Sequence, residues 1–153
     1  MLALASDHAG LELKAAIQKY LESENIPYQD FGTYTNESCS YPEYALKAAD
    51  AVASGACEKG ILLCGTGVGI GIAANKVKGI RCVNCSEPYS ARLSRQHNNT
   101  NMLSLGARVV GEGLALTIVR EWLSADFEGD RHEIRISQIA QIEESGRISS
   151  KNL

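Results

Sequence analysis

The sequence lacks the features that mark nucleic-acid-binding and membrane proteins. Its 15 Lys and Arg are outnumbered by 18 Asp and Glu, so the net charge is -3 and there is no basic excess to bind a polyanion. The longest uncharged stretch, residues 60–75, is broken by glycines and is no membrane span. We therefore expect no nucleic-acid partner and no membrane association.

The amino terminus also lacks an export signal, because the apolar run at residues 2–5 is short and has no basic flank. Five cysteines, an odd number without framework spacing, favour free thiols and a cytoplasmic location. With 153 residues, 44% of them hydrophobic, the chain is typical of a globular protein. We expect a single domain over residues 1–145 and a frayed tail over residues 146–153.

Short apolar runs alternate with helical patterns along the chain. Strands are predicted at residues 2–5, 27–31, 60–64, 80–85 and 102–105, and helices at 11–23, 41–54, 68–78, 88–97, 112–124 and 131–144. Crossovers between parallel strands need helices that cover the sheet. The alternation therefore predicts an α/β protein, a Rossmann-like three-layer α/β/α sandwich with a five-stranded parallel sheet. Ligands in such folds bind beyond the carboxyl ends of the strands.

The most informative segment is the glycine-rich run from Cys64 to Gly71, which follows a buried strand and opens a helix. Alternating glycines let the backbone approach a ligand, and the amides at a helix N-terminus favour an anion or oxyanion. The dinucleotide pattern G-x-G-x-x-G fails in this run, although Glu87 lies at a ribose-binding distance downstream. A tight turn without a ligand is the alternative.

Cys64 ends the strand before this run. Amide donors and a helix N-terminus stabilise a thiolate, so Cys64 is a candidate base or nucleophile; the alternative is a small buried hydrophobic side chain. Cys82 and Cys85 have redox spacing but lie along a predicted strand, and no second pair completes a zinc site. We expect both to pack in the core.

Further polar residues lie where such a site would collect them. Asp7 and His8 occupy the first strand-to-helix turn, where capping of the helix by Asp7 is equally compatible with the sequence. His97 and Asn98 follow a polar helix, which a histidine could simply cap.

Three arginines are candidate phosphate ligands. Arg131 and Arg135 are four residues apart on one helix, so their guanidinium groups can share a face, and Arg108 follows the fifth strand. The alternative for the helical pair is a solvated charged surface.

Together these segments resemble ribose-5-phosphate isomerase type B, a family that also includes the two galactose-6-phosphate isomerase subunits. The matching segments are SDHAG at 6–10, YPEYA at 41–45, CGTGVGIGIAANK at 64–76, GIR at 79–81, CSEPYSARLSRQHNNTN at 85–101, LGARVVG at 105–111 and GDRH at 129–132. The resemblance implies interconversion of ribose 5-phosphate and ribulose 5-phosphate, or of a hexose phosphate such as allose 6-phosphate or galactose 6-phosphate. It implies no metal and no organic cofactor.

The resemblance also implies residue roles. Cys64 moves a proton between C1 and C2 of the open-chain sugar with Thr66 near the reacting oxygens, and Asp7 and His97 open the furanose ring by acid–base action. The substrate-binding residues it implies are His8, Tyr41, Gly65, Gly67, Val68, Gly69, Asn98, Arg108, Arg131 and Arg135.

The family's site lies at a dimer interface, so the resemblance implies a homodimer or a tetramer with active sites between subunits. Asp130 departs from the family pattern, which has a small residue before Arg131, and a carboxylate there weakens the case for Arg131 as a phosphate ligand. The competing function is a nucleotide- or phosphate-binding module without chemistry, which rests on the glycine-rich run and Glu87.

Overall fold

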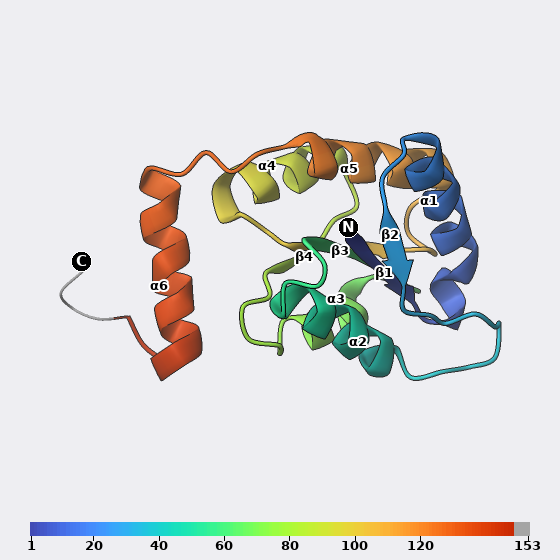
Figure 1. The fold of residues 1–153 in the computed structure, drawn as a ribbon, viewed down its shortest axis with the longest axis horizontal. Coiled ribbons are helices and arrows are strands. Elements are labelled where there is room, and N and C mark those ends of the chain that lie inside the picture. The colour runs from blue at the N-terminus through green and yellow to red at the C-terminus, as the bar shows by residue number, and fades with distance from the viewer. Residues whose placement is uncertain (149–153) are drawn as a thin grey trace.

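A parallel five-stranded sheet lies between two layers of helices in the computed structural model, which describes residues 1–148 (Figure 1). The strands are β1 (Leu2–Ser6), β2 (Tyr28–Asp30), β3 (Lys59–Cys64), β4 (Cys82–Asn84) and β5 (Met102–Gly106), in the order β2-β1-β3-β5-β4. The helices are α1 (Leu11–Ser23), α2 (Tyr41–Ala53), α3 (Val68–Ala74), α4 (Pro88–Asn98), α5 (Glu112–Ser124) and α6 (Arg131–Ser145). This architecture confirms the predicted fold.

Each face of the sheet is buried by its own hydrophobic cluster. On one face, α1, α4 and α5 cover a cluster that contains Leu4, Ile61 and the fully buried Trp122. On the other face, α2 and α3 cover a cluster of smaller residues that includes Ala3 and Leu62. Successive strand residues point to opposite faces, so burial of both faces explains the continuous apolar runs of the sequence.

Helix α3 is shorter than predicted, because it ends at Ala74 rather than at residue 78. The cause is a contact with β4: Asn75 donates from Nδ2 to the Cys82 carbonyl at 2.8 Å and accepts from the Cys82 amide at 2.7 Å. These bonds hold the chain against the sheet. Strand β4 covers residues 82–84, which corrects the predicted range of 80–85.

The two loops that carry the main candidate residues meet at the switch point of the sheet. β2 lies on one side of β1 and β3 on the other, so the strand order reverses here, and folds of this kind bind ligands at such a reversal, beyond the carboxyl ends of the strands. Ser6 pairs with Leu63, so the turn after β1 lies beside Cys64. Gly10 permits this approach, because a methyl group there would lie 2.8 Å from the Leu63 backbone.

Helix α6 stands apart from the layered body (Figure 1). Its exposed surface includes Ile134, Ile139 and Ile142, which are 59%, 46% and 47% exposed. The helix ends at residue 145, and residues 149–153 of the predicted tail lie outside the described residues, so the division into a domain and a tail stays a prediction. Among the described residues, no helix has both the length and the apolarity to cross a membrane.

Candidate active site

Cys64 lies at the carboxyl end of β3, where the glycine-rich loop begins. Its side chain is 5% exposed, and the amide of Gly67 donates to its Sγ atom at 3.1 Å. Gly67 has φ of 78°, a left-handed conformation that turns the backbone toward the sulfur before α3 begins at Val68. The glycine-rich loop thus supplies a backbone hydrogen-bond donor to the Cys64 sulfur.

Two predicted substrate-binding side chains border the same loop. Arg108 lies beside Gly65: its amide donates to the Gly65 carbonyl at 3.0 Å, and a methyl group at Gly65 would lie 3.5 Å from Arg108 Nη1. Tyr41 lies against Gly69, where a methyl group would be 3.0 Å from its hydroxyl oxygen. The loop therefore carries a guanidinium group on one side and a phenol on the other.

Asp7 caps a turn, and its backbone lies beside Leu63, the residue before Cys64. Its Oδ1 atom accepts hydrogen bonds from the amides of Ala9 and Gly10 at 2.9 and 3.0 Å. Its own amide donates to the Leu63 carbonyl at 3.0 Å, one residue before Cys64. These bonds hold a buried carboxylate at the carboxyl end of β1, next to β3.

His8 is oriented by a residue that the sequence did not point to. The Cys39 amide donates to His8 Nδ1 at 3.3 Å, and the Cys39 sulfur lies 3.8 Å from the same nitrogen. Because Nδ1 accepts a hydrogen bond from this amide, the neutral ring carries its proton on Nε2, and this N–H group can donate a hydrogen bond to an anion. Cys39 lies 31 residues from His8, and no local pattern marks it.

Asn84 contacts the glycine-rich loop and is a second residue that the sequence did not point to. Its Nδ2 atom donates to the Thr66 carbonyl at 3.4 Å and to the Ser104 carbonyl at 3.2 Å. Thr66 itself is exposed, and its hydroxyl accepts a hydrogen bond from the Val68 amide at 3.3 Å. Gly106 packs on this segment without a side chain, because a methyl group there would lie 2.6 Å from the Thr66 carbonyl.

His97 and Asn98 lie at the opposite edge of the sheet from Cys64. Helix α4 starts beyond β4 and returns to the edge where the strands begin, and there the Asn98 carbonyl accepts from Arg81 Nε at 3.0 Å. Three residues after Asn98, the carbonyl of Asn101 accepts from the Gly60 amide at 2.9 Å. The four steps from Gly60 to Cys64 span roughly 13 Å of strand. A single chain therefore does not bring His97 to Cys64.

Arg131 and Arg135 belong with His97 rather than with Cys64. They lie at the start of α6, are exposed, and are linked by a bond from Arg135 Nη1 to the Arg131 carbonyl at 2.7 Å. Asp130 precedes them with φ of 48°, a conformation that favours glycine and explains the small residue of the family pattern. The predicted site residues thus form two groups at opposite edges of the sheet.

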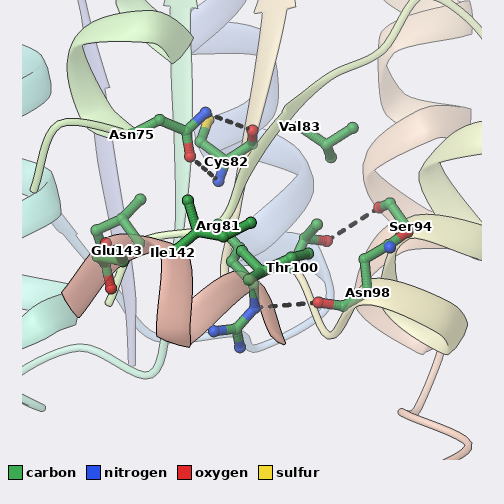
Figure 2. A pocket seen from close by; sticks show the side chains of 11 residues that line it. Asn75, Arg81, Cys82, Val83, Ser94, Asn98, Thr100, Ile142 and Glu143 are labelled. Carbon is green, nitrogen blue, oxygen red and sulfur yellow. Dashed lines mark hydrogen bonds between the residues drawn. The ribbon is translucent and has the colours of Figure 1, made fainter. Parts of the chain in front are cut away.

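A cavity of about 480 Å³ lies beside the second group, between α6 and the body of the domain (Figure 2). Its lining residues are Asn75, Ile80, Arg81, Cys82, Val83, Ser94, Asn98, Thr100, Ile139, Ile142 and Glu143. Most of them surround the starts of β4 and β5, away from Cys64. Ile139 and Ile142 of α6 line this cavity, and both side chains are exposed.

Cys82 and Cys85 are protonated thiols in the sheet region, in agreement with a packing role. Burial raises the pKa of Cys82 to about 12 and that of Cys85 to about 11. Because only the thiolate reacts with iodoacetamide, we expect both residues to remain unlabelled in the native protein at about pH 8. Peptide mass spectrometry checks this, with the urea-unfolded chain as the fully labelled control. Native labelling at the rate of the unfolded chain would contradict it.

Glu87, the residue that favoured a nucleotide, caps α4. Its carboxylate accepts hydrogen bonds from the amides of Tyr89 at 2.6 Å and Ser90 at 2.8 Å. These hydrogen bonds lower the pKa of Glu87. The cap accounts for this carboxylate without a bound ribose.

The family was identified by comparison with known proteins. The model described as Ribose/Galactose Isomerase matches residues 2–139. The chain belongs to this family.

Two members of the ribose/galactose isomerase family and one solved structure are similar to the chain over nearly its whole length. Ribose-5-phosphate isomerase B of Escherichia coli is 53% identical over 94% of this chain and 96% of its own length. D-erythrulose-4-phosphate isomerase of Pectobacterium atrosepticum is 41% identical over 93% of this chain and 94% of its own length. The structure of ribose-5-phosphate isomerase B from Mycoplasma genitalium with bound ribulose-5-phosphate is 40% identical, covers 94% of this chain and 96% of its own, and has a TM-score of 0.90.

Proposed function

We propose that this protein interconverts ribose 5-phosphate and ribulose 5-phosphate with Cys64 as the base, and without a metal or organic cofactor. The observation that carries the proposal is the setting of Cys64 at a strand end, with the Gly67 amide on its sulfur and Arg108 and Tyr41 on the adjoining loop. An aldose–ketose isomerisation needs such a base beside donors for an oxyanion.

The chemistry moves one proton between neighbouring carbons. The Cys64 thiolate takes the proton from C2 of the open-chain aldehyde, and the electron pair shifts onto the C1 oxygen to form an enediolate. Amides of residues 65–69 stabilise this oxyanion, and one such donor contributes about 3 kcal/mol to catalysis. Return of the proton to C1, together with transfer of the C2 hydroxyl proton to the C1 oxygen, gives the ketose. No external electron acceptor is required.

The substrate must first be opened and held. The furanose hemiacetal opens when one group takes the C1 hydroxyl proton and another protonates the ring oxygen, roles that we give to Asp7 and to His97 of the partner subunit. His8 and Arg108 bind the phosphate together with the partner's Arg131 and the partner's Arg135, because guanidinium groups form paired hydrogen bonds with phosphate. Thr66 and Tyr41 line the sugar together with the partner's Asn98.

We propose a homodimer in which each site takes residues from both chains. Two observations support it: the two groups of site residues lie at opposite edges of one subunit, and Ile134, Ile139 and Ile142 are exposed on α6. In a twofold dimer the same surface serves both subunits, so two complete sites form together. A tetramer would pair two such dimers. We keep the cytoplasm as the proposed location, where the five cysteines stay reduced.

A coupled assay on three sugar phosphates tests the proposal. We expect kcat/KM to be higher for ribose 5-phosphate than for allose 6-phosphate or galactose 6-phosphate, and we expect calorimetry to detect no tight binding of NAD or AMP. A higher value for a hexose phosphate would reassign the substrate within the family. Tight nucleotide binding with no turnover of any sugar phosphate would replace the enzyme by a binding module.

A further inference from the structure

Two histidines and a glutamate meet where α4 and α6 join. The rings of His97 and His132 are stacked, with centroids 4.2 Å apart and planes within 6° of parallel. Glu128 Oε2 lies 3.9 Å from His97 Nε2 and 3.7 Å from His132 Nε2. The Glu128 amide donates to the Gln96 carbonyl at 3.0 Å, which ties this carboxylate to the end of α4. His97 therefore has a fixed neighbour on its face and an anion at its edge.

His132 is the inner member of the pair. Its side chain is 12% exposed, against 34% for His97, and its buried Nε2 atom has no hydrogen-bond partner among the described residues. Burial lowers the pKa of His132, and its neighbours His97 and Arg131 lower it further, while Glu128 acts in the opposite direction. The net lowering favours the neutral imidazole. A neutral ring can stack on His97 in either protonation state of His97 without charge repulsion.

The arrangement orients a side chain and does not converge on a metal ion. Three ligand atoms of His97, Glu128 and His132 lie within 4.8 Å of one another. However, the nitrogen lone pairs lie in two nearly parallel planes, so they cannot meet at one point. Zinc needs both nitrogens directed at it from about 2.0–2.1 Å. Chelation would require one ring to leave the stack.

We propose that His132 and Glu128 are positioning residues that hold the His97 imidazole for ring opening in the partner's site. The inference rests on the proposed function. His97 is the last residue but one of α4 and is one-third exposed, so its ring would otherwise sample several rotamers. The stack and the carboxylate select one orientation, and acid–base catalysis depends on such alignment. The stack also joins the start of α6, with Arg131, to α4.

The choice of substrate separates ring opening from isomerisation. In erythrose 4-phosphate the C4 oxygen carries the phosphate, so no hydroxyl can close a five-membered ring and the sugar reacts from its open form. His132→Ala is expected to lower kcat on ribose 5-phosphate by about 10- to 100-fold, while kcat on erythrose 4-phosphate changes by less than about twofold. Glu128→Ala is expected to show the same split. His132→Phe, which keeps an aromatic face against His97, is expected to recover most of the loss.

A second readout uses the ketose itself. Ribulose 5-phosphate is also acyclic, because its C5 oxygen carries the phosphate, so exchange of its C1 proton with deuterated water needs Cys64 but no ring opening. We expect His132→Ala to keep the wild-type exchange rate. Ser137→Ala, an exposed change on α6, is the matched control and should leave every rate unchanged.

The outcomes separate the two proposals. Equal losses for His132→Ala on ribose 5-phosphate, erythrose 4-phosphate and proton exchange would overturn the positioning role in favour of a general effect on folding or phosphate binding. An unchanged rate on ribose 5-phosphate would overturn it as well. A wild-type protein that converts no ribose 5-phosphate would instead overturn the proposed function.

Discussion

Cys64→Ala is expected to lower kcat on ribose 5-phosphate by about 10³- to 10⁴-fold, because it removes the group that accepts the C2 proton. Cys64→Ser should fall nearly as far, since a hydroxyl is a much weaker base than a thiolate in the same position. The affinity for ribitol 5-phosphate, which has no carbonyl group, should stay within about threefold, because the phosphate ligands are untouched. The coupled assay gives the rate, and calorimetry gives the affinity.

The matched control for this change is Cys85→Ala, which alters a buried cysteine outside the crevice. It should lower the melting temperature through lost packing and leave kcat within about threefold. A near-normal rate for Cys64→Ala would remove this residue as the base and with it the proposed mechanism.

Two variants that are nearly inactive alone are expected to recover about a quarter of wild-type activity when their subunits mix. The pair is Cys64→Ala and His97→Asn, one from each group of site residues. In a random mixture half of the dimers are mixed, and each mixed dimer contains one site with both changes and one with neither. Activity per total subunit after co-expression, or after joint refolding, measures the recovery.

The control for this experiment uses two changes from the same group. Cys64→Ala mixed with Asp7→Asn should recover nothing, because every site of the mixed dimer carries one of the changes. If the first pair also recovers nothing although mixed dimers form, the active site does not combine Cys64 of one chain with His97 of the other.

Local sequence patterns were sufficient to predict the parallel sheet and the edge at which candidate residues gather. The alternation of apolar runs and helical patterns predicts parallel strands, which bring their carboxyl ends to one edge, so Asp7 and Cys64 were expected at the same edge. The order of the strands across the sheet was not predicted. The end of α3 did not follow, because it depends on the two bonds between Asn75 and Cys82. That contact exists only once β4 lies beside α3.

The contacts that orient the histidines were also beyond the reach of sequence patterns. Cys39 reaches His8 across a long loop, and His132 reaches His97 only because the segment after α5 folds back onto α4. Neither pair has a spacing that marks it. The roles proposed for His97 and Arg131 came from the family resemblance, since these residues lie far from Cys64 within a single chain.

The close contacts at Gly10 and Gly106 have a consequence for selectivity among sugars. Main chain rests directly on main chain at both positions, so the clearance that the proposed site would leave around the carbonyl carbons of the sugar is set by peptide dimensions and not by rotamers. Replacement of nearby side chains leaves that clearance constant. A sugar with one carbon more or fewer must then be accommodated at its phosphate end, where flexible arginine side chains can adjust to its length.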